Sequence, residues 1–234
     1  MSRNYWTLGK KGMENRLTKV QAAYENAVEN VSDLHVKISE GNNKLGAIPS
    51  VSLIPVMDCG NCAICSKSCY DLRNDMIYKD VIKTRAINSA VYHEDPERYF
   101  KEIDDYINYR YPRAFRFHIG GDIQDKWYLD KMCEIARKHQ DTKFLAFTKM
   151  FDVCNEYLDE GNVIPDNMHI LFSGWLGLKM DNRHGFPEAH PIFESETSAP
   201  EGTLLCTGNC TECLKEDRLC WSIGKGQAVG FLAH

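Results

Sequence analysis

Ten cysteines are the residues of this chain most suited to chemistry, because eight of them fall into two clusters. The first cluster reads Cys59-x2-Cys62-x2-Cys65-x3-Cys69. Four thiolates so close in sequence, at these intervals, are typical of a loop that surrounds a 4Fe-4S cluster from one side. A structural zinc site more often takes two close pairs separated by a longer arm. The spacing therefore predicts an iron-sulfur cluster here, with zinc as the alternative.

The second cluster reads Cys206-x3-Cys210-x2-Cys213-x6-Cys220. It predicts a second 4Fe-4S cluster, with Cys220 as the fourth ligand. A zinc knuckle stays open as an alternative, because the loop is polar and the intervals are less diagnostic. Complete four-thiolate sets are suited to electron transfer or to a structural role, so an electron donor is the expected partner of a redox-active protein.

A second set of candidate residues follows the segment Phe115-Arg116-Phe117-His118-Ile119. Side chains alternate along a strand, so Arg116 and His118 are expected on the face opposite the two Phe side chains. Gly120 and Gly121 would let backbone approach a ligand, and the Asp122 carboxylate could accept its hydrogen bonds. We predict His118 and Asp122 as catalytic residues and Arg116, Gly120 and Gly121 as cofactor-binding residues. A tight turn with Asp near a helix start is the structural alternative.

Two further strand ends add polar residues. Thr148-Lys149 ends the next predicted strand and Ser173-Gly174-Trp175 the one after. The carboxyl ends of parallel strands meet at one edge of a sheet, where ligands bind. We therefore predict a small-molecule or nucleotide pocket with Lys149 as a catalytic residue and Ser173 as a cofactor-binding residue. A solvated lysine is the alternative for Lys149, and His184 and His190 are interpreted as surface or packing residues.

The surrounding pattern predicts an α/β protein. Apolar residues at three- and four-residue intervals indicate a helix within an N-terminal helical segment, residues 1–33. Residues 34–38 and 51–54 read as short strands, and helices are expected within 74–92 and from Asp95-Pro96. A βα series follows: strand 115–119, helix 124–139, strand 143–148, helix 151–158 and strand 169–173. Such a series favours a parallel sheet, either open or curled into a partial TIM barrel with flanking helices.

One domain is expected over residues 1–234, with cysteine-rich metal-binding loops at 55–72 and within a long loop at 177–226. Residues 177–202 have no convincing period and are interpreted as a functional loop. Residues 227–232 read as a last strand.

Composition narrows the class of protein. A chain of 234 residues with 43% hydrophobic content can bury a sizeable core. The net charge of −5 and the lack of a long Lys/Arg run do not indicate a nucleic-acid surface. No signal segment and no run long enough to cross a bilayer is apparent, so we expect a protein of the reducing cytoplasm without a membrane partner.

Several stretches together resemble the gene-product-88-like proteins of bacteriophages and related mobile elements. They are Gly41-Asn42-Asn43-Lys44-Leu45-Gly46, Cys65-x3-Cys69-Tyr70, Arg116-x-His118-x-x-Gly121-Asp122, Phe147-Thr148-Lys149 and Pro165-x-Asn167 with the strand ending at Ser173. They run in the family's order from about residue 38 to 176. The resemblance implies a phage-encoded protein of the host cytosol, in a family whose activity is undefined.

A more distant resemblance is to radical S-adenosylmethionine enzymes, which carry a Gly-Gly-Glu near a strand end. Gly120-Gly121-Asp122 occupies a similar place. It implies a partial barrel and S-adenosylmethionine as a cofactor, but Asp replaces Glu, and the fitting three-cysteine interval lies near the C-terminus. The function expected from the sequence is redox or radical chemistry by a protein with two iron-sulfur clusters. The alternative is a non-catalytic, metal-stapled protein that binds a phage or host macromolecule.

Overall fold

The structure is a computed structural model. It describes residues 10–60, 65–66, 69, 71–72, 78–193 and 197–232, and only the backbone of Lys10, Met13 and Lys79.

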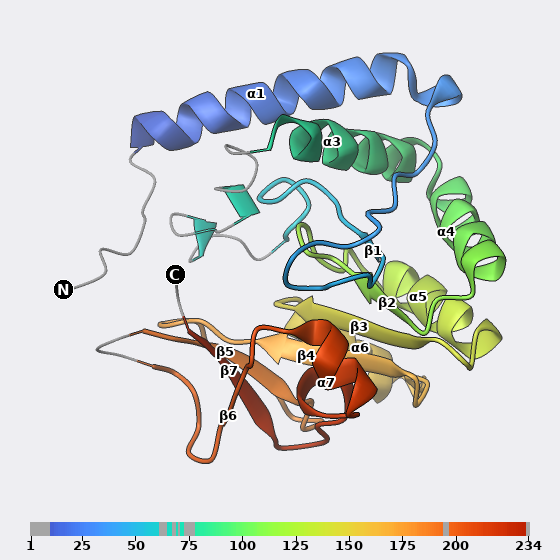
Figure 1. The fold of residues 1–234 in the computed structure, drawn as a ribbon. Helices are drawn as coiled ribbons and strands as arrows, with labels where there is room; N and C mark the ends of the chain where they lie inside the picture. Colours follow the sequence, from blue (N-terminus) through green and yellow to red (C-terminus); the bar gives the residue numbers. More distant parts are fainter. Residues whose placement is uncertain are drawn as a thin grey trace.

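A single parallel sheet organises the described chain (Figure 1). Its strands lie in the order β1-β2-β3-β4-β5-β7-β6, and each neighbouring pair is parallel. Their bounds are β1 Ser50–Val51, β2 Ala114–Phe117, β3 Lys143–Thr148, β4 Met168–Ser173, β5 Glu188–Ile192, β6 Leu204–Leu205 and β7 Ala228–Leu232. All carboxyl ends therefore lie at one edge of the sheet.

The long helices cover one face of this sheet. They are α3 Lys79–Glu94, α4 Pro96–Arg110, α5 Lys126–Lys138 and α6 Phe151–Asp159, while α1 Lys10–Glu29 lies along α3 and leads into η1 Val31–Asp33 (Figure 1). Asp95 and Asp125 begin α4 and α5 because their carboxylates accept from the N–H groups of Arg98 and Tyr128.

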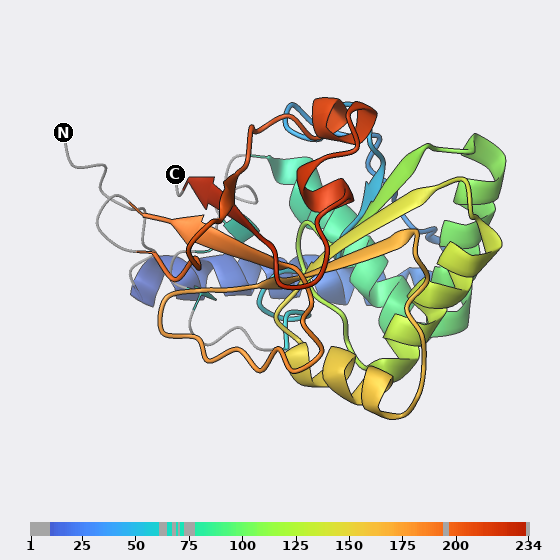
Figure 2. The same ribbon diagram turned by 90° about the horizontal axis from the view of Figure 1, so that it is seen from below.

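The opposite face is covered by a C-terminal lobe, residues 206–227, which lies between β6 and β7 and contains α7 Cys210–Lys215 and η3 Leu219–Trp221. Figure 2 shows α7 on the side of the sheet away from α5 and α6. Alternation along the strands explains two separate cores. Phe115, Phe117 and Phe144 pack toward the long helices. Ala114, Leu145 and Leu171 pack with Trp221 and Cys213 of the lobe.

The α/β class and most elements from residue 79 to 173 are confirmed. The sheet is open, since β1 and β6 lie at its two edges and do not pair in the described chain. No described helix combines the length and apolar character needed to span a membrane.

Two sequence predictions about elements are wrong. Residues 34–38 form no strand, although Ser39 makes an isolated bridge to Ser50. The segment 177–226 is not one long loop, because it contains β5, β6, α7 and η3. Strand β5 escaped notice because Pro191 interrupts its short pattern, and proline lowers the expectation of a strand.

Candidate functional site

Asp122 joins the ends of β2 and β3. Its Oδ1 accepts from the Thr148 hydroxyl at 2.6 Å and from the Ile123 N–H at 2.7 Å. Its Oδ2 accepts from the Lys149 N–H at 2.8 Å. The carboxyl is buried, and burial raises the pKa of Asp122 to about 6 despite these donors. The carboxyl therefore links the ends of two strands through its hydrogen bonds, and its pKa lies near neutrality.

Lys149 and Ser173 are brought together, as predicted. The Lys149 ammonium donates to the Ser173 hydroxyl at 2.8 Å and lies 5.9 Å from the centre of the Trp175 ring. The ends of β2, β3 and β4 thus form one polar edge that contains Asp122, Lys149 and Ser173.

Arg116 and His118 do not share a face, so that prediction is wrong. The Arg116 guanidinium lies over the Phe147 ring at 4.8 Å, on the side of the C-terminal lobe. His118 packs against Tyr128 of α5, with 5.3 Å between ring centres. The reason is that β2 ends at Phe117 and His118 has a φ of 56°, which breaks the alternation of an extended strand.

His118 is buried in the helix-side core, and neither ring nitrogen has a hydrogen-bond partner among the described residues. Burial lowers the pKa of His118 to about 3, so its ring is neutral at physiological pH. A catalytic role for His118 stays a prediction.

Gly120 and Gly121 allow close approach, but of the protein's own groups. A Cβ on Gly121 would lie 2.6 Å from the Leu53 Cβ, and one on Gly120 would lie 2.8 Å from the Arg85 guanidinium carbon. Arg85 forms a buried ion pair with Asp71 at 2.7 Å. A bound cofactor at these glycines is not tested by this packing and stays a prediction.

The first cysteine cluster is described only in part, since Cys62 lies outside the described residues. Cys59 accepts from the Val56 N–H at 3.2 Å, and burial raises the pKa of Cys69 to about 12. The turn that leads to Cys59 is held by Asp58. One Asp58 oxygen accepts from the Ile54 N–H and the Ser89 hydroxyl, and the other lies 2.7 Å from His93 Nε2.

The second cluster is fully described, and its four cysteines gather in the C-terminal lobe. Cys206, Cys210, Cys213 and Cys220 all pack with the lobe core and are thiols, not disulfides. The Gly208 N–H donates to the Cys206 sulfur at 3.4 Å.

The surroundings of these thiols are partly cationic. Burial, followed by the like charge of Cys206, raises the pKa of Cys220 to about 12, while the Arg116 cation opposes the shift. Burial also raises the pKa of Cys210, against the charges of Arg116 and Lys44. A thiolate set in this lobe therefore needs positive charge beyond these two side chains.

The cysteines of the lobe can be compared with the needs of two metal groups, a single metal ion and an iron-sulfur cluster. Among the described residues, no three His, Cys, Asp or Glu side chains are arranged to hold a metal ion. The thiol residue type and the N–H···S contact of Cys206 are of the kind that cluster-binding cysteines use, although only Cys213 of the four is buried. The donor chemistry of the lobe thus fits an iron-sulfur cluster, while the observed positions form no site for a single ion.

Sequence reasoning missed several polar residues. Asp58 and the Asp71–Arg85 pair gave no signal, because their partners are distant in sequence. His190 was interpreted as a packing residue, yet its ring contacts both Glu188 and Ser198. The spacing Glu188-x-His190 on one strand face was the available signal, once β5 is recognised.

Fold and site together define an open parallel α/β protein with a polar strand edge and a cysteine-rich lobe on the face opposite its helices. The family model described as Gene product 88 matches residues 8–221, and the chain belongs to this family. No curated protein and no solved structure matches the chain. Neither the family match nor the open sheet supports the more distant resemblance to radical S-adenosylmethionine enzymes.

Proposed function

We propose that this Gene product 88 protein is an iron-sulfur protein whose C-terminal lobe carries a 4Fe-4S cluster on Cys206, Cys210, Cys213 and Cys220. The supporting observation is that all four thiols pack with one lobe core and that the Arg116 cation acts on two of them, Cys210 and Cys220. Soft thiolates suit iron-sulfur clusters, which supply one-electron transfer when bound. The Cys59, Cys62, Cys65 and Cys69 set is proposed to hold a second cluster on the grounds of its spacing.

The chain's own residues would act around the lobe cluster. Arg116, held on the Phe147 ring, offsets part of the negative charge of the thiolates. The lobe core, with Trp221 fully buried, buries Cys213 and covers the other three cysteines in part, which would limit the access of water to the sulfurs. Hydrogen bonds and solvent exclusion are the protein's means of setting a cluster's potential.

The polar edge supplies the proposed place for a small-molecule or nucleotide substrate. Lys149 and Ser173 would bind its anionic or hydroxyl groups, and Asp122 would exchange a proton near neutral pH. Radical chemistry is not part of this proposal, because four thiolate ligands leave no iron for S-adenosylmethionine to chelate.

Elemental analysis of anaerobically purified protein tests the proposal. We expect iron and sulfide in equal amounts and a broad absorbance near ~400 nm. Cys210→Ala and Cys220→Ala should each lose the lobe cluster and its share of the iron. Cys154→Ala is the matched control, because Cys154 is a buried cysteine of α6 outside both sets. A colourless protein with stoichiometric zinc would contradict the proposal and favour the metal-stapled binding protein instead.

A further inference from the structure

Three side chains near β5 form a hydrogen-bonded chain that the proposed function does not use. Glu188 Oε2 lies 2.7 Å from His190 Nε2, and His190 Nδ1 lies 3.0 Å from the Ser198 hydroxyl oxygen. The order carboxylate, imidazole, hydroxyl is that of an activated serine nucleophile.

The hydrogen positions follow from the chemistry of the partners. An ionised carboxylate only accepts hydrogen bonds, so the Glu188 contact places the imidazole hydrogen on Nε2. The other nitrogen, Nδ1, is then left to accept from the Ser198 hydroxyl. The ring is thereby set in the tautomer that a general base requires.

The His190 imidazole is held in position by its neighbours on β5 and by the space beside Gly174. Glu188 and His190 are two residues apart on β5, so their side chains share a face of the strand. The His190 side chain is 6% exposed. A Cβ on Gly174 would lie 2.4 Å from His190 Nδ1, so the missing side chain at residue 174 provides the room for the ring.

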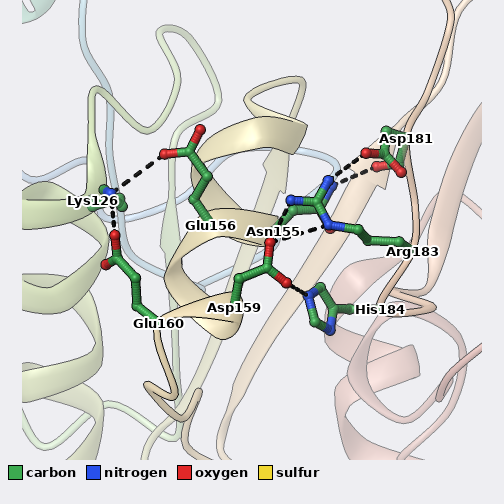
Figure 3. Close-up of polar contacts among 8 residues, drawn as sticks. All are labelled: Lys126, Asn155, Glu156, Asp159, Glu160, Asp181, Arg183 and His184. Atoms are coloured by element: carbon green, nitrogen blue, oxygen red, sulfur yellow. Dashed lines mark hydrogen bonds and ion pairs between the residues drawn. The ribbon is translucent and has the colours of Figure 1, made fainter.

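The carboxylate is anchored in turn. Its second oxygen, Glu188 Oε1, accepts from the Asn182 side chain at 2.8 Å. Asn182 lies in a connection that is fastened to α6: Asn155 donates to the Asp181 carbonyl, and Asp159 contacts Arg183 and His184 (Figure 3). Glu188 is therefore oriented by Asn182, whose segment is attached to α6, as well as by its own strand.

The hydroxyl is accessible. Ser198 is exposed, and the adjacent Thr197 is held near β5 by a bridge to Ile192 and by a hydrogen bond to the Pro191 carbonyl at 3.3 Å. The buried base, His190, thus faces an exposed nucleophile, Ser198. A substrate from solution can therefore reach the Ser198 hydroxyl.

We propose that Ser198, His190 and Glu188 form a serine-nucleophile site that hydrolyses carboxylic esters. Ser198 Oγ forms a bond to the carbonyl carbon while its proton passes to His190 Nδ1. The carbon–oxygen bond to the alcohol then breaks, and the alcohol takes the proton from His190. Water repeats the sequence on the acyl-serine and releases the acid. Glu188 acts through His190 and is a positioning residue.

Covalent labelling of the protein as purified tests this site, with a fluorophosphonate as the probe and peptide mass spectrometry as the readout. We expect the adduct on Ser198. Ser222 is the internal control, because it is exposed and its hydroxyl has no histidine partner among the described residues. Ser198→Ala should abolish the adduct, and Ser222→Ala should leave it unchanged. Absence of an adduct on Ser198 in folded wild-type protein, or equal labelling of Ser198 and Ser222, would overturn the proposal.

Variants of the base and of its anchor separate activation from simple exposure. His190→Gln should slow the labelling of Ser198 by about 100-fold, since the general base is lost. Glu188→Gln should slow it as well, and Glu188→Asp should restore part of the rate, which a merely structural carboxylate would not predict. The same variants should slow the hydrolysis of 4-nitrophenyl acetate in parallel. Labelling that is equally fast in wild type and in folded His190→Gln protein would contradict the assignment.

Discussion

At the scale of single residues, two buried carboxyls, Asp122 and Asp58, hold together the chain segments at and beside the polar edge. Asp58 follows β1 and Asp122 follows β2, and the two segments are joined because the Asp122 N–H donates to the Asp58 carbonyl at 2.7 Å. Gln124 reinforces this contact by donating to the carbonyls of both residues. The two carboxyls differ in their partners, so their removal should have different consequences.

Asp122 should make stability depend on pH. Its pKa of about 6 in the folded state lies above the ordinary aspartate pKa of 3.8, so its stabilising contribution is complete below pH 3.8 and is lost as pH rises through about 6. This difference corresponds to about 3 kcal/mol. Urea unfolding at several pH values should show that slope in wild type and in Asp152→Asn, an exposed control, but not in Asp122→Asn. Equal slopes in all three proteins would place the carboxyl in a more solvated environment.

Asp58 should be a strong determinant of stability. Asp58→Ala leaves the Ile54 N–H, the Ser89 hydroxyl and His93 without their shared acceptor. We expect a loss of about 3 kcal/mol in the free energy of unfolding. Chemical denaturation measures it, and Asp141→Ala is the exposed control. A change of similar size in both variants would refute the role given to this carboxyl.

At the scale of elements, the connection after β2 depends on close packing of backbone. Gly121 has a φ of 78° and Gly161 a φ of 85°, but only Gly121 is crowded, because nothing lies within 4 Å of a Cβ on Gly161. Gly161→Ala should therefore cost about 1 kcal/mol from its conformation alone. Gly121→Ala should cost a further ~1–3 kcal/mol from overpacking. Thermal unfolding of the two variants compares them directly, and equal losses would mean that Leu53 yields easily.

The sequence predicted elements well where periodicity was long. The βα series from residue 114 to 173 was recognised because strands such as Lys143–Thr148 have a mostly apolar centre, residues 144–147 in that strand, and lie between helices of ordinary length. The short strands β5 and β6 were not recognised, since two to five residues with Pro191 or exposed leucines give no period. The separation of Arg116 from His118 depends on one backbone angle, which residue types do not reveal. The meeting of Glu188, His190 and Ser198 likewise depends on β5 and on the return of the chain at Thr197.

At the scale of the whole molecule, the two cores should respond separately to damage. Trp221 is among the largest fully buried side chains and belongs to the lobe core. Trp221→Ala should loosen the lobe while leaving the helix-side core packed, at a cost of about 3–5 kcal/mol. Hydrogen exchange should accelerate in residues 206–223 more than in β3. Trp127→Ala is the control, because Trp127 is 38% exposed on α5. Uniform acceleration across both regions would mean that the cores unfold as one unit.

The position of β7 between β5 and β6 has a consequence for biosynthesis. Strands β1 to β5 are adjacent in the order in which they leave the ribosome, so each can dock on its predecessor as it emerges. Strand β6 has no neighbour in the sheet until residues 228–232 arrive and insert beside it. The cysteine-bearing lobe therefore cannot close until β7 has been made, and its thiols stay more accessible to solvent until that strand inserts.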